Sequence, residues 1–113
     1  MADMDEAAPD VEHAVIAHYR LAGDGLGESS QREVIRQAQS LLTDAIELAD
    51  VGEFDGNEYG GGEVVLYAYG PDADALFAVM APILNDLPFR PAHAVLRYGS
   101  VDDPSTAEHR IDL

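Results

Sequence analysis

Cysteine, lysine and tryptophan are absent from this chain of 113 residues. Without cysteine, disulfides, thiolate metal sites, iron–sulfur clusters and thiol nucleophiles are excluded together. Without lysine, all positive charge rests on 6 arginines, which stand against 22 Asp and Glu, so the formal net charge is −16. Because nucleic-acid affinity depends largely on cationic contacts to phosphates, we expect the protein to bind neither DNA nor RNA.

The surplus of acid has two interpretations. It can form a solvated surface that keeps the protein soluble, as in the acid-rich proteome of a halophile or a high-GC bacterium. It can also steer the chain toward a basic partner protein, because complementary charge accelerates and orients association. The composition favours the first interpretation and leaves the second open.

Long apolar runs are also missing. No segment approaches the ~20 apolar residues that cross a membrane, and the first residues lack the basic start and apolar centre of a signal peptide. We therefore expect a cytoplasmic protein that does not associate with membranes. A chain of this length forms one domain, and its acidic, proline-containing beginning is typical of disorder. The predicted organisation is a disordered tail over residues 1–12 and a single domain over residues 13–113.

The spacing of apolar residues predicts strands and helices in the order β-α-β-β-α-β. Ser30 and Glu33 have the spacing of a capping box at the start of the first helix. The expected elements are strands over 13–21, 51–55, 63–69 and 92–98, helices over 30–49 and 72–87, a turn over 56–62 and an optional last strand over 108–113. This order is typical of the ferredoxin-like α+β sandwich, in which a four-stranded antiparallel sheet carries both helices on one face.

The other face of such a sheet is left without helices. On the third strand, the small residues Ala68 and Gly70 suit close packing against the helices, so the alternate side chains point to the open face. With the strand order expected for this fold, 4-1-3-2, the open face gathers a group of aromatic and cationic side chains: His18, Arg20, Tyr67, Tyr69, His93 and Arg97. A semi-apolar patch of this kind is more often an interface than an accident.

Two uses of this patch remain open. It can be covered by the C-terminal strand or tail, or by a second copy of the chain in a homodimer formed sheet to sheet. Alternatively, it can be a site for a small anion or a partner protein, in which Arg20 and Arg97 pair with a carboxylate or phosphate and the tyrosines stack on the ligand.

An acidic hairpin lies between the second and third strands. It begins like a calcium-binding EF-hand loop, but Tyr59 and Leu66 stand where that loop needs oxygen ligands. A different divalent-cation site remains an alternative, with its ligands drawn from Asp55, Asn57, Glu58 and Glu63. A pair of carboxylates from this segment could also serve in acid–base catalysis. The simpler interpretation is turn chemistry, because Asn, Asp and Gly accept left-handed backbone conformations.

Known catalytic patterns are missing. The four histidines are scattered without the spacing of a helical zinc site, the serines occupy predicted caps and turns, and the glycine-rich loops lack the lysine of a P-loop. The sequence therefore predicts no catalytic residue and no cofactor.

The run GEFDGNEYGGGEVVLYAYGPDADALF, followed by PAHAVLRYG, resembles a group of small bacterial proteins that are frequent in high-GC genomes. The resemblance extends over residues 13–113. It implies a free-standing cytoplasmic domain, and because the group has no assigned activity it supplies no catalytic residue. Compact acidic immunity proteins resemble the chain in fold and charge.

These observations predict a non-enzymatic binding domain that uses its open sheet face for homodimerisation or for a partner. One alternative is an immunity-type protein that neutralises a basic toxin. A second alternative is a small enzyme with a carboxylate or divalent-metal site in the hairpin over residues 53–63.

Overall fold

The computed structural model describes residues 12–99 and 105–113 of the chain. Nearly all of the tail predicted over residues 1–12 lies outside the described residues, so that prediction stays a prediction. The elements are β2 (His13–Arg20), α1 (Ser29–Ala49), β3 (Glu53–Gly60), β4 (Glu63–Gly70), α2 (Ala73–Asp86), β5 (Ala92–Arg97) and β6 (Glu108–Asp112). The architecture is α+β, and its first six elements follow the predicted order.

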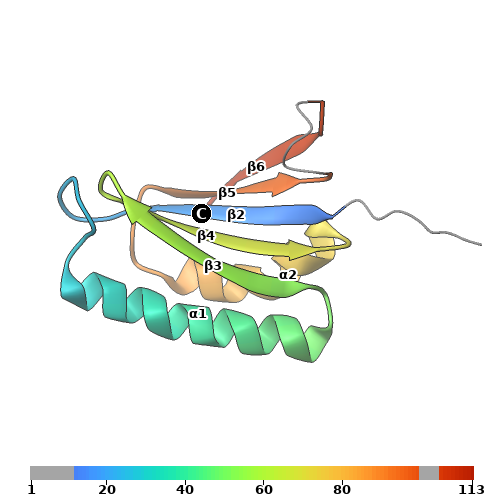
Figure 1. Ribbon diagram of the computed structural model, residues 1–113, viewed down its shortest axis with the longest axis horizontal. Coiled ribbons are helices and arrows are strands. Elements are labelled where there is room, and N and C mark those ends of the chain that lie inside the picture. The colour runs from blue at the N-terminus through green and yellow to red at the C-terminus, as the bar shows by residue number, and fades with distance from the viewer. Residues whose placement is uncertain (1–11, 100–104) are drawn as a thin grey trace, which may run out of the picture.

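The strands form one sheet in the order β3-β4-β2-β5-β6, and every neighbouring pair is antiparallel. Four of these strands have the order expected from the sequence. The prediction of a four-stranded sheet is wrong in its count, because the optional last strand is present as β6. It pairs with β5 from Arg97 opposite Glu108 to His93 opposite Asp112. Both helices lie against the same face of the sheet (Figure 1).

The core fills the space between the sheet and the two helices. Every second residue of the three central strands points into it, as strand geometry requires. The strand residues of the core are Val15, Ala17, Tyr19, Val64, Leu66, Ala68, Ala92, Ala94 and Leu96, and the helices add Ile35, Ala38, Leu42, Ile46, Ala73, Leu76, Met80 and Leu84. One polar group in this core is the hydroxyl of Tyr19, which donates a hydrogen bond of 2.7 Å to the carbonyl of Leu84.

Helix α1 begins earlier than the Ser30–Glu33 pattern predicts. Glu28 is the N-cap, and the side chain of Gln31 accepts a hydrogen bond of 2.9 Å from the Glu28 amide to complete a capping box. The same Gln31 oxygen accepts from the amide of Ala22 at 3.2 Å. Gln31 rather than Glu33 therefore completes the capping box, because its side chain satisfies two backbone donors of the loop before the helix.

The hairpin of β3 and β4 is tighter than predicted. β3 continues through the segment expected as a turn, and only Gly61 and Gly62 connect the strands, with φ of 60° and 77°. Two consecutive positive φ angles are the requirement of a type I′ hairpin turn, which glycine meets without strain. The register shifts between Phe54 and Gly56, so a bulge at Asp55 interrupts the outer strand.

Candidate functional site

The open face of the sheet is the candidate site, because alternate residues of its strands point away from the helices and no helix or strand of the described part of the chain covers it. The structure places all six predicted residues on this face. Two rows cross the three central strands through directly paired residues, and we call them the central rows: Tyr67–Ile16–Val95 and Val65–His18–His93. Their side chains are half-buried or buried. The centre of the open face is therefore apolar and aromatic.

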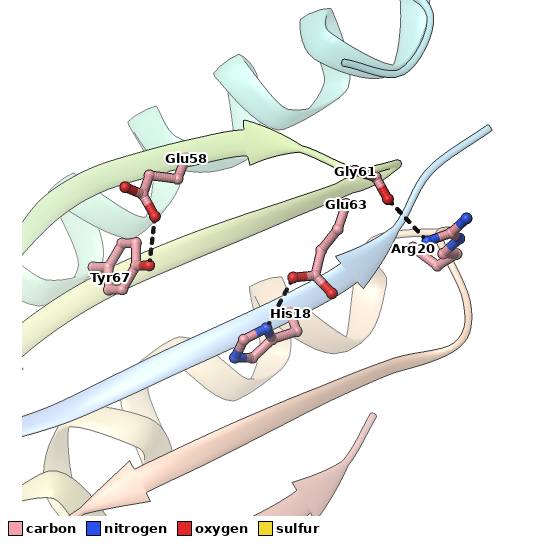
Figure 2. A network of polar contacts seen from close by, with 6 residues as sticks. All are labelled: His18, Arg20, Glu58, Gly61, Glu63 and Tyr67. Carbon is pink, nitrogen blue, oxygen red and sulfur yellow. Dashed lines mark hydrogen bonds and ion pairs between the residues drawn. The ribbon is translucent and has the colours of Figure 1, made fainter. Parts of the chain in front are cut away.

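A stacked pair of imidazoles occupies one of the central rows. The rings of His18 and His93 lie 4.5 Å apart between centroids and 7° from parallel. Figure 2 shows the Glu63 carboxylate beside His18, with 3.3 Å between Oε2 and Nδ1. Burial, the charge of His18 and that of Arg110 lower the pKa of His93, against smaller opposing effects of Asp112 and Glu63. The pair lies in an open depression of about 220 Å³, lined by His18, Arg20, Glu63, Pro91, His93 and Arg110.

Arg20 and Arg97, which would bind the ligand if the face were an anion site, are engaged by the protein itself. Arg20 reaches toward the β3–β4 turn (Figure 2) and donates to the carbonyls of Gly61 at 3.1 Å and Gly23 at 3.4 Å. Arg97 forms an ion pair with Glu108 of the neighbouring strand β6. An anion at this face would have to compete with these partners, which makes a dedicated anion site the weaker use of the surface.

The tyrosines lie toward the acidic edge of the open face. The Tyr67 hydroxyl donates a hydrogen bond of 2.9 Å to Glu58 (Figure 2). Burial raises the pKa of Tyr67, and the hydrogen bond to Glu58 raises it further. Burial also raises the pKa of Tyr69, followed by the negative charge of Asp55. An apolar ring held beside carboxylates can pack against a carbon chain that ends in a positive charge.

The four residues proposed as cation ligands do not converge on one point, because three of them contact different side chains of the protein. The Asn57 amide donates to Gln39 of α1 at 2.9 Å, on the helix side of the sheet. Glu58 and Glu63 lie on the open face, where they contact Tyr67 and His18. Among residues 12–99 and 105–113, no group of three or more His, Asp or Glu side chains is arranged to hold a metal ion. The metal site and the carboxylate enzyme stay predictions.

Sequence reasoning overlooked the charged residues of β6. Glu108, Arg110 and Asp112 extend the open face beyond β5, through pairing opposite Arg97, Val95 and His93. Their signal was present in the sequence as a negative–positive–negative alternation at every second position. That spacing places all three charges on one face of a strand.

Comparison with models of protein families, with curated proteins and with solved structures finds no match to this chain. Of the described helices, none has the length and apolar character needed to cross a membrane.

Proposed function

We propose that this chain is a non-enzymatic binding domain with a ferredoxin-like arrangement, and that its open sheet face binds a basic protein partner. The observation that carries this proposal is the pair of central rows, which place apolar and aromatic side chains across three neighbouring strands, on the face opposite the two described helices. Continuous apolar surface of this kind marks interaction sites in soluble proteins, and aromatic residues are enriched at the centre of protein interfaces.

The charge around the central rows supports a basic partner. Glu53, Asp55 and Glu58 are exposed along β3 at one border of the face, and the whole chain carries a formal charge of −16. Two copies stacked face to face would bring these like charges close together, and their repulsion would disfavour such a homodimer. A partner with apolar side chains and a basic rim would gain attraction from the same charges. A basic toxin bound by an immunity-type protein is one partner of this chemistry.

A designed amphipathic helical peptide, with leucine on one face and lysine or arginine on the other, tests this proposal because it has the chemistry of the expected partner. The isotope-labelled protein is titrated with the peptide and followed by NMR. We expect the amides of Ile16, Val65 and Tyr67 to shift most. Binding should weaken as salt is raised from ~0.01 M to ~0.15 M, because the Debye length falls from about 30 Å to 8 Å.

Two matched variants locate the binding surface. Tyr67→Asp adds a charge to a central row, and Leu48→Asp adds the same charge on α1, where the leucine is 91% exposed. We expect Tyr67→Asp to abolish peptide binding and Leu48→Asp to leave it unchanged. The reverse result would assign binding to the exposed apolar side of α1 and would overturn the proposal.

A further inference from the structure

The two edges of the sheet differ in how they are protected. At β3, the bulge at Asp55 and a line of exposed acids interrupt the edge, and Asn57 ties the strand to α1. Bulges and repeated like charges are the devices by which proteins prevent pairing at a sheet edge. At the other edge, the pairing of β6 with β5 is regular and its exposed charges alternate in sign.

Backbone groups of β6 are available for pairing with another strand. The amide of Tyr98 donates to the carbonyl of Ala107 at 3.1 Å, and the amide of Leu113 donates to that of Ala92 at 3.0 Å. In an antiparallel ladder, hydrogen-bonded pairs alternate with non-hydrogen-bonded pairs. The odd-numbered residues of β6 therefore bond to β5. The N–H and C=O groups of Glu108, Arg110 and Asp112 point to the free edge, where no described residue bonds to them.

The charges of β6 restrict how two copies of this edge can pair. A two-fold axis at Arg110 would place Arg110 opposite itself and Glu108 opposite Asp112, which is unfavourable because like charges directly opposite destabilise a sheet. An axis at Ile111 places Arg110 opposite the second copy's Asp112, twice. Both residues have their backbone groups at the free edge, so they can form hydrogen-bonded pairs in this register.

Two further features favour the axis at Ile111 over one at His109, which would pair Glu108 with Arg110. Glu108 is already held in an ion pair with Arg97 of its own chain. Arg110 and Asp112 interact with each other along the exposed strand, at 3.1 Å from Nε to Oδ1, and can exchange this contact for one across the edge. In addition, the two Ile111 side chains, each partly buried against its own core, would meet on the helix side.

We propose that two copies of this chain pair β6 to β6, antiparallel, about a two-fold axis at Ile111. The pairing joins the two sheets into one, with both pairs of helices on one side and both open faces on the other. This inference goes beyond the proposed function, since the edge and the open face are different surfaces. The dimer tightens as salt is raised, because salt screens the repulsion between two chains of −16 more than it affects contacts across the edge.

A charge-exchange experiment tests the pairing. Arg110→Asp alone places Asp opposite Asp at both cross-edge positions, and Asp112→Arg alone places Arg opposite Arg. Each single variant is expected to raise the dimer dissociation constant by about 100-fold, because two attractive cross-strand pairs become repulsive. When the two variants are mixed, every position again faces an opposite charge, so a heterodimer is expected at equimolar ratio. Solution mass by light scattering at low and moderate salt gives the readout.

Restoration of the dimer on mixing, and in the double variant Arg110→Asp/Asp112→Arg, separates lost pairing from lost folding. Wild type that stays monomeric at all salt concentrations would overturn the edge dimer and leave the open-face proposal to its peptide titration. A dimer that Tyr67→Asp disrupts and Arg110→Asp does not would also overturn it, because self-association would then use the open face. Single variants that dimerise as wild type does would exclude the Ile111 register.

Discussion

Replacing Tyr19 by phenylalanine tests how the core accommodates its buried hydroxyl. The ring of Tyr19 has no solvent exposure, and its hydroxyl donates to the carbonyl of Leu84 at 2.7 Å. Tyr19→Phe keeps the ring and removes only this donor. The Leu84 carbonyl then retains a single longer hydrogen bond, of 3.4 Å from the amide of Leu87.

The expected loss is about 1 kcal/mol in the free energy of unfolding, the usual net contribution of an intramolecular hydrogen bond. A domain of this size should then melt about 4–8 °C lower. The difference also depends on pH. Burial raises the pKa of Tyr19, against a smaller lowering by Arg90. Because the pKa of Tyr19 is higher in the folded than in the unfolded protein, its contribution to the free energy of unfolding is complete below the unfolded pKa of about 10. That contribution is lost as the pH rises further.

Urea unfolding followed by circular dichroism, at neutral pH and above pH ~10, measures both effects. We expect wild type to exceed Tyr19→Phe at neutral pH and the difference to shrink in alkali. The control is Tyr98→Phe, which removes an exposed hydroxyl that donates to Asp74 at 2.7 Å and should change stability by less than ~0.5 kcal/mol. If Tyr19→Phe were as stable as wild type, or if the difference grew in alkali, the assigned role of the hydroxyl would be refuted.

Three further predictions concern single sites. Gly52→Ala should prevent stable folding, because Gly52 has a φ of 148° and an added Cβ would lie 2.2 Å from a backbone carbonyl oxygen of β4. At Gly25, the control, an added Cβ meets nothing within 4 Å. Thermal melting of Gly52→Ala and Gly25→Ala compares the two. Asp72→Ala should cost about 1 kcal/mol in the free energy of unfolding, because its side chain accepts hydrogen bonds from the amides of Asp74 and Ala75 at 3.0 and 3.2 Å. Asp72→Asn should recover most of the loss in the same melt. The pKa of His93 is lowered in the folded protein. The folded state is therefore favoured fully only above the unfolded pKa of about 6.5, and the free energy of unfolding falls as the pH drops below that value. His93→Gln should flatten that part of the dependence of the free energy of unfolding on pH, as measured by urea unfolding at a series of pH values.

Much of the fold was predictable because local chemistry and long-range pairing agree. In β2, the alternate residues Val15, Ala17 and Tyr19 are all apolar or aromatic, whereas the other face of the strand carries His18 and Arg20, so parity assigned the core face correctly. In α1, several apolar stripes fit the same sequence. The structure buries Ile35 and Leu42 and leaves Leu41 58% exposed, because the approach of the sheet decides which stripe is covered, and periodicity cannot show that approach.

The candidate site was predictable to the level of faces and not of contacts. Strand parity placed His18 and His93 together on the open face, since residues that are directly opposite share a face. Their stacking depends on side-chain rotamers, which spacing does not determine. The ion pair of Arg97 with Glu108 depends on β6 lying beside β5, and spacing alone predicts that last strand only as an option.

The position of β2 at the centre of the sheet has a consequence for how the chain folds. Although β2 is the first strand of the sequence, both of its neighbours come later in the chain. It pairs with β4, where His13 lies opposite Gly70, and with β5, where Ala14 lies opposite Arg97. During synthesis the edge of β2 that bonds to β5 stays unpaired until β5 has left the ribosome, whereas α1 and the β3–β4 hairpin can form from neighbouring residues. Contacts between such distant segments slow folding, since the chain loses loop entropy before the contacts stabilise it. The pairing of β2 thus becomes complete only with β5, and the sheet becomes complete only when β6 has added to the edge of β5.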